Sequence, residues 1–138
     1  MGHTASKYIS KCSILVGKIP SWCYNKISDT DKYNLSLLID DLGKPGDFIL
    51  SHIDNRPTNL FFGGAPYTHL GIITDRNYVI DMVAKGDRKT SVYDWLDGKD
   101  RILVVRASTL TKEQTNQIVE FAEEIYVKET PYDFFFFY

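Results

Sequence analysis

The stretch THLGIITDRNYVIDMV at residues 68–83 decides the fold, because it contains two apolar runs separated by a short polar segment. The runs cover residues 68–74 and 78–83, and both are rich in the branched aliphatic side chains that favour strands. The DRN segment at residues 75–77 is suited to a tight connection. The stretch therefore predicts an antiparallel β-hairpin.

The hairpin brings a histidine and an aspartate within reach of each other. With the turn at residues 75–77, position 69 pairs roughly with position 83, so Asp81 is a diagonal neighbour of His69 on the same face. A buried carboxylate needs a partner, and a carboxylate can orient an imidazole that acts as a general base. His69 and Asp81 are therefore the candidate catalytic residues. Two simpler structures stay open: a solvated Asp81 that points outward, and a half-buried His69 bonded to a backbone carbonyl.

Helical and strand patterns flank the hairpin on both sides. Apolar spacing and cap residues predict helical segments at residues 4–19, 30–42, 92–96 and 111–126. Apolar runs predict further strands at residues 48–50, 101–106 and 134–138. Gly43 and Ser91 are the expected caps, and Thr111 begins a capping box. The apolar face of the helix behind this box comprises Ile118, Phe121, Ala122 and Ile125. These elements indicate an α+β fold with helices packed on an antiparallel sheet.

The length of 138 residues fits a single domain spanning residues 1–138. Within it we expect a helical N-terminal part at residues 1–43 and a sheet with a helix at residues 44–138. No apolar run approaches the roughly 20 residues that cross a bilayer, so no transmembrane segment is expected. The first residues lack the basic and apolar regions of a signal peptide, which predicts a cytoplasmic location.

Charge and cysteine spacing exclude further classes of partner. The 16 basic and 18 acidic residues give a net charge of -2 without a basic stripe, so no nucleic-acid partner is expected. Cys12 and Cys23 have neither CxxC nor Cys/His spacing. We therefore expect no zinc site.

Six aromatic residues lie between Tyr132 and Tyr138. An exposed aromatic strand is an aggregation hazard. Two explanations are open: an oligomer or a second segment covers this C-terminal end, or the natural chain continues beyond it.

Several motifs, taken in order, resemble a known family. They are GDFIL at residues 46–50, YTHLGII at 67–73, YVID at 78–81, VYDWL at 92–96, the helix at 111–126 and PYDF at 131–134. Together they resemble the NlpC superfamily of papain-like cysteine hydrolases, in its circularly permuted YiiX/YebB-like branch. The resemblance covers roughly residues 42–138 and implies a papain-like fold with His69 as general base and Asp81 as its orienting acid.

The sequence differs from this family at the nucleophile. In the permuted branch a cysteine at a helix N-terminus, usually in a Cys-Ser-Glu context, follows the segment that resembles residues 132–136. No cysteine follows His69 here, so the resemblance implies that the given sequence stops before the nucleophile helix. Cys12, in KCSILV at residues 11–16, has the order of the unpermuted branch, but its mid-helix position favours a buried structural role. Cys23 is no better suited.

The resemblance implies a hydrolase that attacks an amide, ester or thioester carbonyl with a thiol and needs no metal and no organic cofactor. Its substrates would be peptides, other amides or lipid-acyl groups. Whether the chain is an enzyme depends on a nucleophile supplied by the full-length protein. The alternative is a catalytically inactive relative that serves as a binding or interaction module.

Overall fold

The computed structural model describes residues 21–25, 29–54, 59, 63–75 and 77–129. Along the chain the elements are β1 (Ser21–Asn25), α2 (Asp29–Leu42), β2 (Phe48–His52), β3 (His69–Asp75), β4 (Tyr78–Val83), β5 (Gly86–Ser91), α3 (Val92–Trp95), β6 (Arg101–Val105) and α4 (Lys112–Val127). The predicted α+β class is confirmed. No helix among these residues has the length and apolar character needed to cross a membrane.

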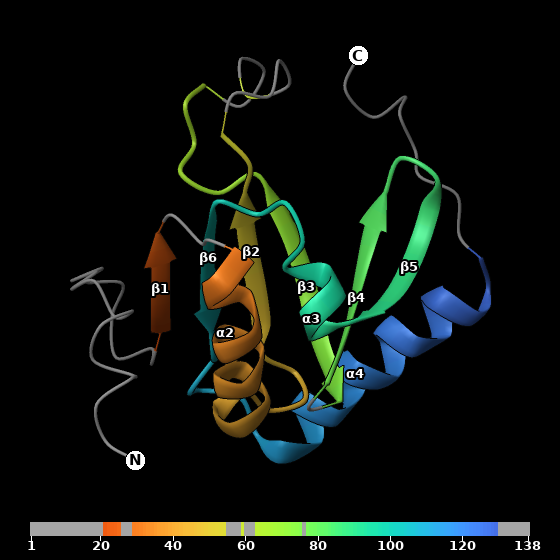
Figure 1. Ribbon diagram of the computed structural model, residues 1–138. Coiled ribbons are helices and arrows are strands. Elements are labelled where there is room, and N and C mark those ends of the chain that lie inside the picture. Colours follow the sequence, from red (N-terminus) through yellow and green to blue (C-terminus); the bar gives the residue numbers. More distant parts are fainter. Residues whose placement is uncertain (1–20, 26–28, 55–58, 60–62, 76, 130–138) are drawn as a thin grey trace.

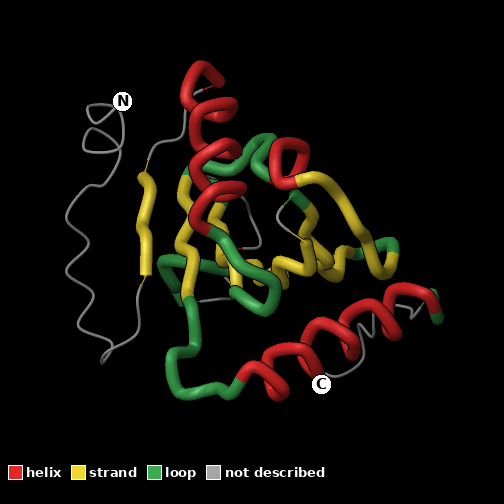
Figure 2. The backbone as a smooth tube through the Cα atoms, turned by 90° about the horizontal axis from the view of Figure 1, so that it is seen from below, coloured by secondary structure: helices red, strands yellow, loops and turns green. Residues whose placement is uncertain are grey.

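The strands form one six-stranded sheet in the order β1-β6-β2-β3-β4-β5, and the neighbouring strands are antiparallel (Figure 1). Figure 2 shows α2 and α3 on one side of the strands and α4 on the other. The predicted hairpin is the β3–β4 pair, with Gly71 opposite Asp81. The caps at Gly43, Ser91 and Thr111 are also present.

The main core lies between the sheet and the two helices α2 and α3. Residues that face each other across neighbouring strands share this side of the sheet, since side chains alternate along each strand. The buried cluster comprises Leu35, Ile39, Ile49, Ile73, Val79, Val92, Trp95, Leu96, Ile102 and Val104. His69, two residues before Gly71 on β3, belongs to the same face at the edge of this core.

Two strands were not predicted, and both lie at the edges of the sheet. β5 has the polar sequence GDRKTS, and β1 has SWCYN without clear alternation. β5 is specified by its pairing with β4, and β1 by its pairing with β6, rather than by an apolar pattern in their own sequences. The N-terminal part therefore contains a strand as well as a helix. The helix predicted at residues 4–19 and the strand predicted at 134–138 lie outside the described residues.

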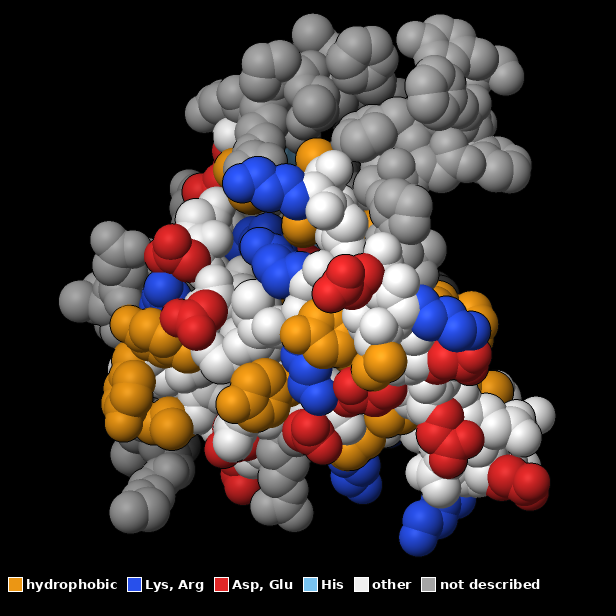
Figure 3. All heavy atoms as spheres, turned by 90° about the vertical axis from the view of Figure 1, so that its right-hand side faces the viewer, with side chains coloured by type: hydrophobic (Ala, Val, Ile, Leu, Met, Phe, Trp, Pro, Cys, Tyr) orange, Lys and Arg blue, Asp and Glu red, His pale blue; other side chains and the backbone are white. Residues whose placement is uncertain are grey.

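The apolar face predicted for α4 is only partly buried. Phe121 was placed on the apolar face of α4, but its side chain is 61% exposed, whereas the adjacent Ala122 is buried. The buried face of α4 is therefore narrower than the apolar face that the sequence predicts. Figure 3 shows the side of the molecule with β5 and α4, where basic and acidic side chains are mixed. One such pair, Lys89 with Glu123 at 2.7 Å, joins β5 to α4.

Gly71 is the position where the hairpin tolerates no side chain. A Cβ there would lie 2.5 Å from Cγ1 of Val79 and 3.3 Å from Cγ2 of Ile49, and both neighbours are fully buried. We expect Gly71→Ala to lower the free energy of unfolding by about 1–3 kcal/mol through overpacking, measured by urea denaturation. Leu70→Thr, on the exposed side of the same strand, is the control and is expected to cost less than about 1 kcal/mol. Equal losses would contradict the packing argument.

Candidate active site

His69 begins β3 directly after a loop that contains Gly63 and Gly64, both with positive φ. Its backbone is paired with Ser51 of β2, so the rigid sheet fixes the position of the side chain. The imidazole side chain is 28% exposed. A ring held by a strand and partly open to solvent satisfies two requirements of a general base, which are fixed geometry and access to substrate.

The imidazole of His69 is bonded to the carboxylate of Asp81. His69 Nε2 lies 2.7 Å from Asp81 Oδ2, and the Asp81 side chain is 0% exposed. Gly71 is directly opposite Asp81 and has no side chain, and the carboxylate bonds to the diagonal neighbour His69. The sequence predicted the shared face and the diagonal relation, and the structure brings the two groups into direct contact.

Two further groups that the sequence analysis missed bind the same carboxylate. Arg88 of β5 donates from Nε to Oδ1 at 2.9 Å and from Nη2 to Oδ2 at 2.5 Å. The indole Nε1 of Trp95 on α3 donates to Oδ2 at 2.7 Å. Trp95 belongs to the VYDWL motif, but Arg88 could be found only by recognising β5 and its register, in which Arg88 is opposite Asp81.

The donors around Asp81 keep it ionised despite its burial. Burial alone would raise the pKa of the Asp81 carboxyl. The hydrogen bonds from His69 and Arg88 and the positive charge of Arg88, with a smaller effect of the indole bond, instead lower the pKa of Asp81 to about 2. An ionised carboxylate only accepts, so Nε2 of His69 carries the proton of this bond. Nδ1 is then the ring nitrogen that can take a proton from another group.

The indole of Trp95 also forms a wall beside the imidazole. The two rings are stacked at an interplanar angle of 23° with centroids 6.1 Å apart. Trp95 is almost fully buried, and Nζ of Lys99 lies 5.0 Å from the centroid of its ring. The ring of His69 is therefore held at Nε2 by the carboxylate and supported on one side by the indole.

Ser51 lies opposite His69 in the sheet register but does not complete a serine-type triad. Its side chain is 0% exposed, so no substrate carbonyl could reach the hydroxyl. Among the described residues its Oγ has no hydrogen-bond partner. Ser51 therefore belongs to the floor beneath the site rather than to its reacting surface.

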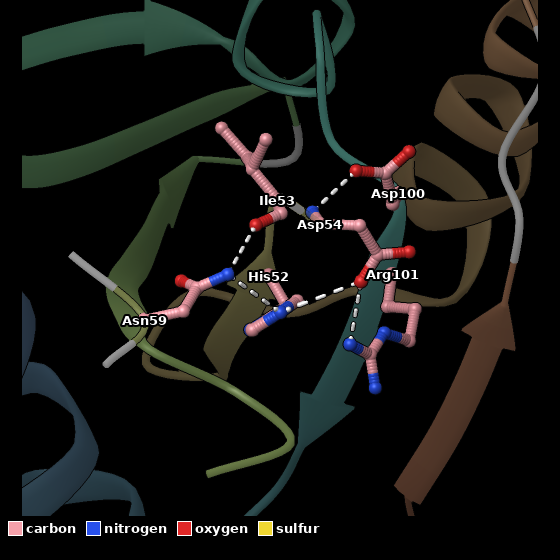
Figure 4. A network of polar contacts seen from close by, with 6 residues as sticks. All are labelled: His52, Ile53, Asp54, Asn59, Asp100 and Arg101. Atoms are coloured by element: carbon pink, nitrogen blue, oxygen red, sulfur yellow. Dashed lines mark hydrogen bonds and ion pairs between the residues drawn. The ribbon is translucent and has the colours of Figure 1, made fainter. Parts of the chain in front are cut away.

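A second polar cluster surrounds His52, the next residue on β2, whose side chain is on the other face of the sheet (Figure 4). His52 Nε2 lies 3.3 Å from Nδ2 of Asn59 and 3.4 Å from Oδ1 of Asp54. Arg101 of β6 donates to the same Asp54 oxygen at 2.7 Å. The backbone N of Asp54 in turn donates to Asp100 at 2.6 Å. These contacts fasten the start of the β2–β3 loop to β6, which makes the cluster structural.

Cys23, the one cysteine within the described residues, is not beside His69. Cys23 lies on β1, which is separated from β3 by β6 and β2, a distance of about 14 Å at the usual spacing of strands. Cys12, His3 and the aromatic segment at residues 132–138 lie outside the described residues. Within the described ranges, no group of three His, Cys, Asp or Glu side chains is arranged to hold a metal ion.

Comparison with known proteins identifies a matching family. The family model described as permuted papain-like amidase enzyme, YaeF/YiiX, C92 family, matches residues 43–138, more than half of the sequence. The matched range begins just before β2 and contains His69, Asp81 and Arg88. No curated protein and no solved structure matches. The permuted, YiiX-like branch predicted from the sequence is thereby confirmed, together with the papain-like fold.

The ionised Asp81 predicts a specific dependence of stability on pH. The pKa of Asp81 is about 2 in the folded protein against an ordinary value of 3.8. The contribution of the ionised carboxylate to the free energy of unfolding is therefore complete above about pH 4 and is lost as the pH falls through 2. The difference corresponds to about 2 kcal/mol. Asp81→Asn is expected to remove this part of the decline in urea-unfolding free energy between pH 5 and pH 2.

Asp97→Asn is the matched control for that experiment. Asp97 forms a 2.8 Å ion pair with Lys32, but its side chain is exposed to water, which screens the pair. The variant is expected to keep the acid-induced loss of the original protein. If Asp81→Asn also keeps it, Asp81 is not the group whose ionisation stabilises the fold.

Proposed function

The chain belongs to the permuted papain-like amidases of the YaeF/YiiX, C92 family, and we propose that it is a cysteine hydrolase in which His69 is the general base. The observation that carries the proposal is the 2.7 Å contact between His69 Nε2 and the buried, ionised Asp81. This contact assigns the proton to Nε2 and leaves the lone pair on Nδ1. A base with a fixed tautomer and a partly open ring is what activation of a thiol requires.

The thiol is proposed to come from a cysteine that follows Tyr138 in the full-length protein. Cys23 is separated from His69 by two intervening strands, and the order of motifs agrees with the permuted branch, in which the nucleophile follows the base. Such a cysteine would be activated by transferring its proton to Nδ1 of His69. The resulting imidazolium would be stabilised by Asp81.

The proposed reaction is acyl transfer from an amide to water in two steps. The thiolate attacks the carbonyl carbon, a carbon–sulfur bond forms, and the carbon–nitrogen bond breaks as His69 returns the proton to the leaving amine. Water then attacks the acyl-enzyme, His69 accepts one of its protons, and the carbon–sulfur bond breaks to release the acid and the thiol. Peptides and other amides are the proposed substrates, and ester or thioester acyl groups would follow the same steps.

Substitution of the proposed base tests this assignment. In the full-length protein, His69→Ala is expected to lower kcat/KM for amide hydrolysis by about 10²–10⁴-fold, because proton transfer is lost. The assay would follow amine release from a panel of peptide and acyl amides. His52→Gln is the control histidine and is expected to retain activity once the folded fraction is matched by circular dichroism. Equal activity of His69→Ala and the original protein would exclude His69 as the base.

Alkylation identifies the nucleophile and separates the enzyme from the inactive alternative. Iodoacetamide is expected to label one thiol of the full-length protein rapidly, and the labelling is expected to slow in His69→Ala. The label should persist in the double variant Cys12→Ser/Cys23→Ser. Its loss in that variant would place the nucleophile at Cys12 or Cys23. Absence of both His69-dependent labelling and amide hydrolysis would favour a binding module.

A further inference from the structure

Arg88 occupies a position in the site that the family resemblance did not indicate. Gly71, Asp81 and Arg88 lie opposite one another across β3, β4 and β5, so the arginine reaches the carboxylate from the side away from β3. Its guanidinium makes the two bonds described above, one to each carboxylate oxygen. Its side chain is 39% exposed, whereas the carboxylate that it binds is fully buried.

The distribution of donors over the two oxygens shows what Arg88 adds. Oδ2 accepts from His69, Trp95 and Nη2 of Arg88, whereas Oδ1 accepts from Nε of Arg88. The bonds from His69 and Trp95 act on Oδ2 alone. The two-point contact with the planar guanidinium holds both oxygens, so it fixes the plane of the carboxylate and opposes its rotation about the bond to Cβ. Oδ2 is thereby held in the direction of the imidazole.

Charge compensation is the second contribution of Arg88. A general base must be neutral before it accepts a proton, and in that state His69 supplies no positive charge to Asp81. A fully buried carboxylate without a nearby cation is strongly unfavourable. Arg88 remains charged in both protonation states of the imidazole. The lowered pKa of Asp81 agrees with this compensation.

We propose that Arg88 is a positioning residue of the active site, which fixes the plane of the Asp81 carboxylate and balances its charge while His69 is neutral. This inference rests on the proposed function, because the neutral state matters only if His69 acts as a base. Arg88 acts through Asp81 rather than on the substrate. It follows that replacing Arg88 should disturb the orientation of the imidazole more than the binding of substrate.

The molecule contains a closely matched control. Arg106 binds the buried Asp47 in the same manner, with Nε to Oδ1 at 2.8 Å and Nη2 to Oδ2 at 2.6 Å. Asp47 lies beside Ile73 of β3, because the backbone N of Ile73 donates to the carbonyl oxygen of Asp47 at 2.9 Å. This pair is four residues along β3 from His69, about 13 Å away. Arg106→Gln thus removes an equivalent ion pair without touching the site.

The test observes the hydrogen bond itself in the full-length protein. In the original protein, the Nε2 proton of His69 bonded to Asp81 is expected as a low-field proton NMR signal, assigned by its loss in His69→Ala. Arg88→Gln is expected to abolish or exchange-broaden this signal, and Arg88→Lys, which keeps a charge but not the planar contact, is expected to shift it. Arg106→Gln is expected to leave it unchanged. A signal unaltered in Arg88→Gln would overturn the inference, as would its equal loss in Arg106→Gln.

Kinetics give an independent readout. Arg88→Gln is expected to lower kcat for amide hydrolysis by about 10²-fold, the effect of a misoriented catalytic group, with little change in KM. A change confined to KM would make Arg88 a substrate-binding residue and overturn the inference. If Arg88→Gln does not fold by circular dichroism, Arg88→Lys decides by the same criteria. If even the original protein shows no hydrolysis, the proposed function fails, and the NMR comparison still decides whether Arg88 positions the pair.

Discussion

The buried carboxylate of Asp81 is the interaction on which this part of the structure depends. It gathers donors from β3, β5 and α3, so three separate elements meet at one side chain. An ionised group without water is tolerated only where its bonds are complete. The same set of bonds that makes the burial tolerable also fixes the imidazole of His69. Stability and the geometry of the proposed base therefore come from one cluster of contacts.

Local packing explains why the hairpin can hold such a group. Gly71 places no side chain opposite Asp81, and the space that it leaves is filled by Val79 and Ile49, which close over the strand. The histidine two residues earlier then lies at the edge of the core, where its ring is bonded on the buried side and open on the other. The His-x-Gly spacing thus has a physical basis: the glycine lets the core close over the strand, and its partner in the register, Asp81, is the diagonal neighbour of the proposed base.

The parts of the fold predicted from the sequence are those specified by local pattern. The hairpin was visible in its two apolar runs, and the diagonal relation of His69 and Asp81 followed from its register. The caps of α3 and α4 were visible in Ser91 and Thr111. β5 could not be predicted because GDRKTS has no apolar alternation and becomes a strand only by pairing with β4. Because β5 was not predicted, the contact of Arg88 with Asp81 could not be predicted either. That contact depends on a neighbour in space rather than in sequence.

The position of β5 at the edge of the described sheet has a consequence for the dynamics of the site. Charged residues on an edge strand hinder pairing with other chains, and Arg88 and Lys89 are well placed for that purpose. Edge strands are also where local opening is least costly. Because Arg88 binds Asp81 only while β5 is paired with β4, detachment of this edge and protonation of the carboxylate favour each other by thermodynamic linkage. The protection of the β5 amides, measured against their intrinsic exchange rates at the same pH, would therefore fall under the acidic conditions that neutralise Asp81, and the proposed site would open at β5 before the core of the sheet unfolds.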